Sequence, residues 1–232
     1  MSKKIAILQS NYIPWKGYFD LISSVDEFIL YDDMQYTRRD WRNRNKIKTI
    51  NGPQWLTIPV DVKGKYHQSI KDTQIIDNTW AKKHWNTIKQ NYSKSKYFIV
   101  YELLFEDFFK NCREESLSLI NYKFIRMINE ILGIKTKISW SSDFILVDGK
   151  SERLLGLCKD CHATEYISGP AAKNYLDESL FEQHSIKVTW MDYSDYPEYD
   201  QRFAPFEHGV TILDLIFNEG HNAYKFMKNN DK

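Results

Sequence analysis

The chain has 232 residues, of which 42% are hydrophobic and 27% charged, and its formal net charge is +1. This length is sufficient for one domain with a sizeable core, and the near-neutral charge argues against binding nucleic acid or an anionic membrane through an overall electrostatic field. No apolar run is long enough to span a bilayer or to act as a signal peptide, so we expect a cytoplasmic protein. Three cysteines, an odd number, argue against a disulfide framework.

The first elements predict a βαβ unit. Residues 4–8 and 27–31 are apolar runs bounded by polar residues, which is typical of buried strands. Between them, Pro14 favours a turn at residues 11–14, and residues 15–23 form a short helix. This order predicts that the two strands pair in parallel within one sheet.

A β-hairpin follows this unit. Residues 46–49 and 55–60 flank Asn51-Gly52, a dipeptide typical of hairpin turns. Residues 69–76 are interpreted as one more strand.

The remaining elements predict an α/β fold. Helices are expected at about residues 78–92, 96–109 and 114–132, the last ending at Gly133. Strands at 135–140, 164–167 and 186–191 then alternate with helices at 151–161, after Ser168-Gly169-Pro170, and at 211–218. We therefore expect a single domain over residues 1–232: a mainly parallel, Rossmann-like sheet flanked by helices, with a small β-hairpin and a helical insertion at about residues 78–133.

An arginine-rich segment, residues 32–45, follows the second strand. It contains four arginines, at positions 38, 39, 42 and 44, together with Tyr36 and Trp41. Guanidinium groups bind phosphate or carboxylate through paired donors, and rings offer a flat face to a base or a sugar. The segment predicts a site for an anionic small molecule. Asp32 and Asp33 lie at the carboxyl end of the preceding strand, where α/β sheets place ligands, and Asp33 is the candidate base.

Two further loops are expected at the same edge of the sheet. The turn with Asn11, Tyr12 and Trp15 precedes a helix start at which Gly17 and Tyr18 lie, and such starts attract anions. Ser168-Gly169 repeats this arrangement after a later strand. If the sheet is doubly wound, these loops and the arginine-rich segment converge on one crevice; in the alternative, Tyr12 and Trp15 simply anchor the first helix.

The sequence contains two other patterns that are typical of functional sites. Cys158-Lys159-Asp160-Cys161-His162 matches the haem-attachment pattern, but it lies in an amphipathic helix, so buried free thiols are the expectation and no metal site is predicted. No pair of histidines has metal-ligand spacing. His208 and His221 flank an acidic, glycine-containing segment near the C-terminus, and both are candidate acid or base groups.

The chain resembles the WbqC-like family almost from end to end. The opening Gln9-Ser10-Asn11-Tyr12-Ile13-Pro14-Trp15-Lys16-Gly17-Tyr18-Phe19-Asp20 is similar to the family's first motif, with Ser10 where that motif has proline. Later similarities comprise Asp33, Gln35, Trp41-Arg42-Asn43-Arg44-Asn45, Trp55-Leu56-Thr57-Ile58-Pro59-Val60, Tyr166-Ile167-Ser168-Gly169 and Leu213-Asp214-Leu215-Ile216-Phe217-Asn218.

The resemblance implies a role in the biosynthesis of bacterial surface polysaccharides of the O-antigen type. It implies a transferase that adds an acyl or aminoacyl group to a nucleotide-linked amino sugar, with the sugar nucleotide and the group donor as partners, and it identifies no cofactor. Trp15-Lys16-Gly17-Tyr18 also resembles the helix start of adenylating α/β enzymes, but their two histidines are replaced here by Trp15 and Tyr18, so an adenylating enzyme of this kind would be atypical.

Three hypotheses follow: a sugar-nucleotide transferase, a non-catalytic protein that binds a sugar nucleotide or assists assembly, and RNA binding, which the near-neutral pI disfavours. The candidate catalytic residues are Asp33 and His208, and replacement of Asp33 by asparagine is expected to abolish turnover. The candidate ligand-binding residues are Asn11, Tyr12, Trp15, Gly17, Tyr18, Gln35, Arg39, Trp41, Arg42, Asn43, Arg44, Ser168, Gly169 and Asp214.

Overall fold

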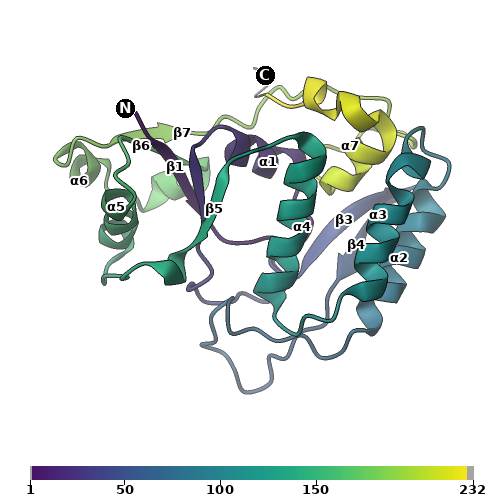
Figure 1. The fold of residues 1–232 in the computed structure, drawn as a ribbon, viewed down its shortest axis with the longest axis horizontal. Helices are drawn as coiled ribbons and strands as arrows, with labels where there is room; N and C mark the ends of the chain where they lie inside the picture. The colour runs from purple at the N-terminus through teal and green to yellow at the C-terminus, as the bar shows by residue number, and fades with distance from the viewer. Residues whose placement is uncertain (1, 229–232) are drawn as a thin grey trace.

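A five-stranded, fully parallel sheet forms the centre of the computed structural model, which describes residues 2–228 (Figure 1). The strand order is β5-β2-β1-β6-β7. The strands are β1 (Lys4–Leu8), β2 (Glu27–Leu30), β5 (Lys137–Trp140), β6 (Glu165–Ser168) and β7 (Lys187–Trp190). The first strand is central, with Ile5 aligned to Glu27 on one side and to Tyr166 on the other. The expected βαβ unit and α/β fold are confirmed.

Helices cover both faces of this sheet, as its buried strands require. Along β1, Ala6 packs towards α1 (Lys16–Ser23) and α4 (Leu117–Leu132), whereas Ile5 and Ile7 pack towards α5 (Lys150–Asp160) and α6 (Glu178–Glu182). This alternation follows from the two-residue period of a strand. The chain therefore leaves the adjacent strands β1 and β6 towards opposite faces of the sheet, which creates a crevice at their carboxyl ends.

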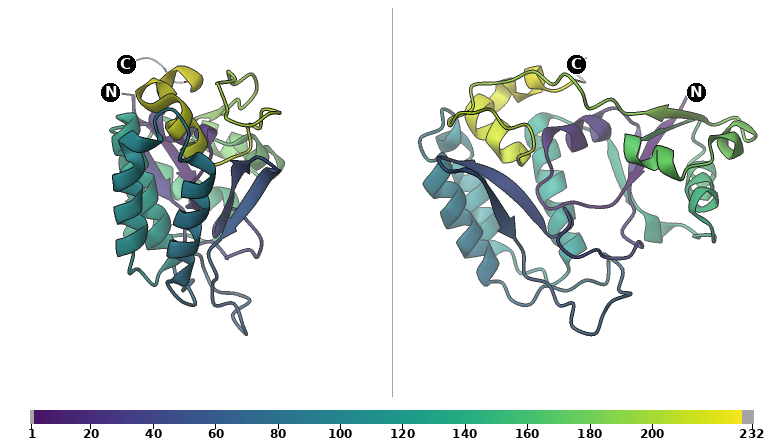
Figure 2. Two further views of the ribbon diagram at one scale, coloured as in Figure 1. Left: turned by 90° about the vertical axis from the view of Figure 1, so that its right-hand side faces the viewer. Right: turned by 180° about the vertical axis from the view of Figure 1, so that it is seen from behind.

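A second layered unit lies beside the sheet. The hairpin of β3 (Arg44–Thr49) and β4 (Gly52–Thr57) packs its buried face, with Ile47 and Leu56, against α2 (Thr79–Tyr92) and α7 (Ile212–Glu219), and α3 (Phe98–Asn111) lies beside α2 (Figure 2). The apolar cluster of this unit is continuous with that beneath α1, so the two parts share one core. The predicted hairpin is confirmed, but its turn consists of Ile50 and Asn51, because Gly52 already pairs with Thr49, and its second strand is residues 52–57 and not the expected 55–60.

Three further expected elements differ in the structure. The helix expected directly after Ser168-Gly169-Pro170 is a short 3-10 helix, Pro170–Asn174. Within the described chain, residues 69–76 form no continuous strand, because Ser69, Gln74 and Ile75 each bridge to a different partner segment. The helix expected from residue 114 begins at Leu117, because Ser116 caps it by accepting a hydrogen bond from the Leu119 N–H.

The three cysteines are free and buried, as expected. Burial raises the pKa of the Cys161 thiol to about 11, so it stays protonated and unreactive at neutral pH. Among residues 2–228, no group of three or more His, Cys, Asp or Glu side chains is placed to hold a metal ion, and no helix is long and apolar enough to cross a membrane.

Glu27 links the three strands at one edge of the sheet. Its carboxylate, 2% exposed, lies 2.7 Å from the Lys3 Nζ and 2.8 Å from the Lys137 Nζ. Burial raises the pKa of Glu27, but hydrogen bonds from Lys137, Lys3 and Ser139 outweigh it and hold the pKa at about 2. Because this value is below the pKa of about 4.3 in an unfolded chain, the carboxylate stabilises the fold above pH ~4.3, and this contribution is lost as the pH falls towards 2.

We predict that Glu27→Gln destabilises the protein by about 2 kcal/mol near pH 6, allowing for solvent screening of the two lysines, and by much less near pH 2. Urea unfolding over a pH series measures the difference. Glu130→Gln removes an exposed helix-surface ion pair to Arg126 and should change the free energy of unfolding by less than about 0.5 kcal/mol. A pH-independent difference between wild type and Glu27→Gln would contradict this prediction.

Candidate functional site

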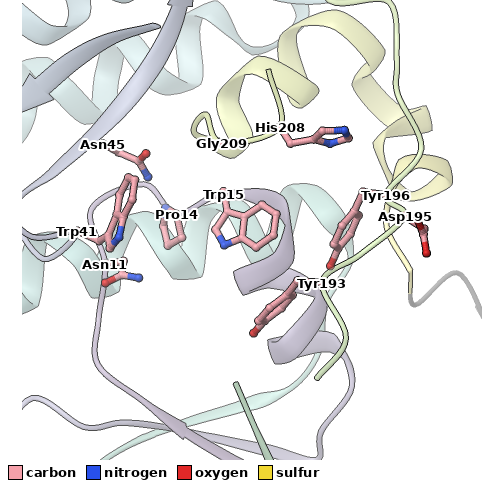
Figure 3. Close-up of a pocket in the computed structure, with 10 residues that line it drawn as sticks. All are labelled: Asn11, Pro14, Trp15, Trp41, Asn45, Tyr193, Asp195, Tyr196, His208 and Gly209. Carbon is pink, nitrogen blue, oxygen red and sulfur yellow. The ribbon is translucent and has the colours of Figure 1, made fainter. Parts of the chain in front are cut away.

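A cavity of about 470 Å³ opens beside the carboxyl ends of the central strands (Figure 3). It is lined by three separate segments: the loop after β1, the arginine-rich segment, and the segment after β7. The lining residues are Asn11, Pro14, Trp15, Trp41, Asn45, Tyr193, Asp195, Tyr196, His208 and Gly209. Four of these ten residues are tryptophan or tyrosine, and the other lining residues include amide, imidazole and carboxylate groups.

The first two segments are held together by hydrogen bonds. The Tyr12 N–H donates to the Trp41 carbonyl at 3.0 Å. The buried Asn45 amide, on β3, donates to the carbonyls of Tyr12 and Ile13 at 3.1 and 2.7 Å. The loops that follow the first two strands therefore meet, as the sequence predicted.

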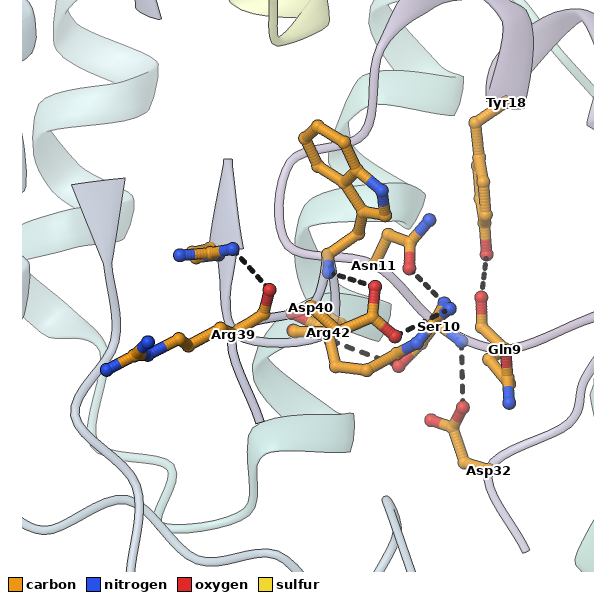
Figure 4. Close-up of polar contacts among 11 residues, drawn as sticks. Gln9, Ser10, Asn11, Tyr18, Asp32, Arg39, Asp40 and Arg42 are labelled. Atoms are coloured by element: carbon orange, nitrogen blue, oxygen red, sulfur yellow. Dashed lines mark hydrogen bonds and ion pairs between the residues drawn. The ribbon is translucent and has the colours of Figure 1, made fainter. Parts of the chain in front are cut away.

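Two buried polar side chains, those of Asp32 and Asn121, also support the loop after β1. The Ser10 N–H donates to the buried Asp32 carboxylate at 2.7 Å, and the Asn121 amide on α4 donates to the Ser10 hydroxyl and the Arg42 carbonyl (Figure 4). Burial raises the pKa of Asp32, although hydrogen bonds from Ser118 and Ser10 oppose this effect. Serine at position 10 thus has a specific use, since proline, the residue in the family motif, has no N–H to donate.

The Trp15 ring depends on the glycine two residues later. A Cβ atom at Gly17 would lie 2.4 Å from the Trp15 ring, so only glycine allows the indole to fold back across the start of α1. In this position the ring meets Tyr193 and Tyr196 edge to face, at centroid distances of 5.4 and 5.5 Å. Gly17 therefore shapes the cavity through Trp15.

The four arginines of the arginine-rich segment have different partners, and Figure 4 shows Arg39 and Arg42. Arg42 donates to the Asn11 side chain at the cavity and lies 3.4 Å from Asp40. The Arg44 guanidinium stacks on Trp55 and donates to the Arg39 carbonyl, whereas the exposed Arg38 donates to the Val62 carbonyl. Arg42 is therefore the guanidinium tied directly to the cavity lining.

Residues 191–210, all within the described part of the chain, contain neither helix nor strand, and they form one wall of the cavity. Lys16, buried on α1, anchors this segment: its Nζ donates to the Pro197 carbonyl at 2.9 Å and lies 4.9 and 5.3 Å from the ring centres of Tyr196 and Tyr199. Burial lowers the pKa of Lys16 to about 8, although the charge of Asp20 opposes this.

His208 lies on the same segment and lines the cavity. Its ring packs against Phe206 at a centroid distance of 4.6 Å. Burial lowers the pKa of His208, and the nearby positive charge of Lys16 lowers it further. The imidazole is therefore mainly neutral at pH 7, the form that accepts a proton.

The sequence pattern of the WbqC-like protein family matches residues 9–226. The chain belongs to this family. A protein of Mycobacterium tuberculosis described as uncharacterized protein Rv1507c is 51% identical over 226 residues, covering 97% of this chain and 98% of that protein. No solved structure matches the chain.

Several family-motif residues lie beneath the cavity. The hydroxyl of Tyr12, a buried residue, lies 2.8 Å from the His84 Nδ1, and the buried Tyr18 donates to the Gln9 carbonyl at 3.0 Å. The Asn43 amide donates to the Ile58 carbonyl at 2.8 Å. These side chains hold the loops in place.

The other candidate residues lie farther along the same edge. The exposed Gln35 donates to the Tyr66 carbonyl, and the Ser168 hydroxyl lies 3.2 Å from that of Tyr166. A Cβ atom at Gly169 would approach the Tyr193 hydroxyl to 3.8 Å, so this glycine borders the cavity wall.

The carboxylates of Asp33 and Asp214 both accept hydrogen bonds from neighbouring side chains. Asp33 pairs with Lys71 and accepts a hydrogen bond from Ser141 at 2.6 Å, and it lies outside the set of described residues that line the cavity. Asp214, fully buried on α7, accepts hydrogen bonds from Tyr92 and Tyr199 at 2.7 and 2.6 Å. Burial raises the pKa of Asp214, and its hydrogen bonds, first that from Tyr199, oppose the rise.

Four cavity residues were not expected from the sequence: Tyr193, Asp195, Tyr196 and Gly209. The available signal was the tyrosine-rich and acidic run that follows the last strand, in which tyrosines recur at positions 193, 196 and 199. Three tyrosines in seven residues outside any helix or strand indicate a structured loop, because such a segment has little other means of burying apolar surface.

We predict that Gly17→Ala displaces the Trp15 ring from the cavity wall and destabilises the protein by about 1–3 kcal/mol, because the added methyl group overlaps the indole. Near-ultraviolet circular dichroism and urea unfolding measure the two effects.

Gly156→Ala on α5 is the matched control. Its Cβ atom would lie 3.6 Å from Val147, an ordinary contact, so this variant should be neutral or up to about 1 kcal/mol more stable. Equal effects of the two substitutions would contradict a specific role for Gly17.

Proposed function

We propose that this protein is an enzyme of bacterial surface-polysaccharide biosynthesis of the O-antigen type, which transfers an acyl or aminoacyl group to a nucleotide-linked amino sugar. The observation that carries the proposal is the cavity wall formed by Trp15, Trp41, Tyr193 and Tyr196. Aromatic faces suit the apolar faces of sugar rings and bases, and the few polar groups among them provide orientation. The role implied by the resemblance to WbqC-like proteins supports the same reading. A nucleotide-linked substrate places the reaction in the cytoplasm.

His208 is the proposed general base. The amine of the sugar attacks the carbonyl carbon of the donor, the bond from that carbon to the leaving group breaks, and His208 takes the proton that the nitrogen loses. Two features support this role: His208 lines the cavity, and burial and Lys16 lower its pKa so that the neutral imidazole dominates at pH 7.

Asp33 is the second candidate for the base. Its carboxylate is occupied by Lys71 and Ser141, so it would first have to exchange one of these partners. Asp33→Asn therefore serves as the comparison: turnover that disappears in Asp33→Asn but survives in His208→Gln would transfer the role to Asp33.

The substrate is identified by thermal denaturation with nucleotides, sugar nucleotides and acyl donors, since a ligand at 100 times its Kd stabilises the fold by about 2.7 kcal/mol. Product analysis with the stabilising pairs then measures transfer. Stabilisation without product under any donor would favour a non-catalytic sugar-nucleotide-binding protein.

We predict that His208→Gln lowers kcat by about 10²–10⁴ and leaves KM nearly unchanged, because a positioned base contributes this much to rate. The wild-type rate should fall only at a pH below about 6.5, the pKa of an ordinary histidine, because the pKa of His208 is lowered.

His184→Gln is the control for this prediction. His184 is exposed, and its Nδ1 lies 2.9 Å from the Leu180 carbonyl at the end of α6, so the variant should retain the wild-type rate and pH profile. A His208→Gln variant with wild-type kcat would refute the proposed role.

A further inference from the structure

The outer face of the β-hairpin carries two cations and two indole rings. Because side chains alternate along a strand, Arg44 and Lys46 of β3 share one face, and Trp55 of β4 lies directly opposite Lys46 in the register. The Arg44 Cζ lies 4.1 Å from the centre of the Trp55 ring, and the Lys46 Nζ lies 5.4 Å from it. Trp41 lies beside Trp55, with ring centres 5.3 Å apart. We call Trp41, Arg44, Lys46 and Trp55 the hairpin ladder.

The hairpin ladder combines two half-buried cations with flat apolar surface that is open to solvent. Trp41 and Trp55 are 41% and 40% exposed. Within residues 2–228, neither Arg44 nor Lys46 has a carboxylate oxygen within 4.0 Å. The ladder therefore combines two cations that have no carboxylate partner, although Arg44 donates to the Arg39 carbonyl, with two accessible ring systems.

The ladder is continuous with the cavity. Trp41 belongs to both, and it lies beside Asn45 and Asn11 in Figure 3. The Lys46 Nζ also reaches the cavity rim, since a Cβ atom at Gly209 would lie 3.9 Å from it. A ligand that fills the cavity and extends past Trp41 would thus meet the Lys46 ammonium first and the Trp55 ring beyond it.

A structural role explains part of this arrangement. A cation over an exposed ring stabilises a hairpin modestly, and the Arg44–Trp55 stack alone would supply that. It does not account for a second cation on the same ring or for a second exposed indole that also lines a cavity. Those features match what a phosphate-bearing ligand with a planar group requires.

We infer that the hairpin ladder binds the nucleoside diphosphate part of the substrate, with the base stacked on Trp55, the phosphates against Lys46 and Arg44, and the sugar directed into the cavity towards His208. This assignment rests on the proposed nucleotide-linked substrate. It also defines the orientation of the ligand. The nucleotide lies on the hairpin, and the amino sugar lies between Trp15 and the segment after β7.

Isothermal titration calorimetry tests the inference with three probes: uridine diphosphate, adenosine diphosphate and inorganic pyrophosphate. Both nucleotides should bind about 10–100 times more tightly than pyrophosphate, because stacking on an aromatic ring contributes that factor. Affinity should fall as salt concentration rises, since the phosphates face cations that have no carboxylate partner. Failure of both nucleotides to bind, or equal affinity for pyrophosphate, would overturn the assignment.

Two substitutions locate the binding. Trp55→Ala and Lys46→Ala should each weaken nucleotide binding at least about tenfold, whereas Trp55→Phe should retain most of the affinity because it preserves a flat ring. Lys82→Ala, on the exposed face of α2, is the matched charge control and should bind as wild type does. Unfolding midpoints are measured in parallel. Unchanged nucleotide affinity in a folded Trp55→Ala variant would overturn the inference.

Nucleotide binding and acyl transfer, measured separately, distinguish failure of the hairpin ladder from failure of the proposed function. Nucleotide binding that depends on Trp55, without acyl transfer from any donor, would support the ladder and refute the transferase. Acyl transfer with wild-type KM in Trp55→Ala would support the transferase and refute the ladder.

Discussion

The double hydrogen bond from the Asn45 amide to the carbonyls of Tyr12 and Ile13 is the constraint on which the cavity depends. Ile13 has a φ of 38°, a left-handed conformation that costs a β-branched residue of order 1–3 kcal/mol. The hydrogen bonds hold the backbone there, and Pro14 and Trp15, which follow directly, line the cavity. Because Asn45 belongs to β3, the hairpin positions the loop that follows β1, and the Tyr12 N–H then fixes Trp41.

The opposite wall is irregular in backbone but firmly tied to the core. Lys16 holds the chain at Pro197, and Asp214 accepts a hydrogen bond from Tyr199. Both ionisable groups are buried, and such burial is tolerated only where hydrogen bonds or charges compensate it. The same contacts place His208 beside Lys16, so the group that shapes the wall also keeps the imidazole neutral. Shape and reactivity of the site therefore have a common origin.

The high aromatic content has two separate uses. Tyr12 and Tyr18 are buried and anchor the loops through their hydroxyl groups, while Trp15 and Trp41 line the cavity. The opening motif was expected either to line a crevice or to anchor the first helix. Each expectation applies to different residues of the motif. Spacing along the chain does not separate these uses, because residues 12 and 15 lie in the same turn and differ only in what the rest of the fold places against them.

The sequence by itself determined most of the elements and their order: the apolar runs of the strands, the hairpin signal of Asn51-Gly52 and the Gly133 helix end all act within a few residues. It also located the edge of the sheet at which the cavity lies. Only the tertiary structure decided which charged groups remain available. Asp33 is bound by Lys71 and Ser141, Arg38 donates to the Val62 carbonyl, and Arg44 donates to the Arg39 carbonyl and lies over the Trp55 ring. The residues after β7 likewise became part of the site only through Lys16 and Asp214. Local pattern specifies backbone conformation, whereas the partner of a charged or aromatic side chain is chosen by packing between segments far apart in the chain.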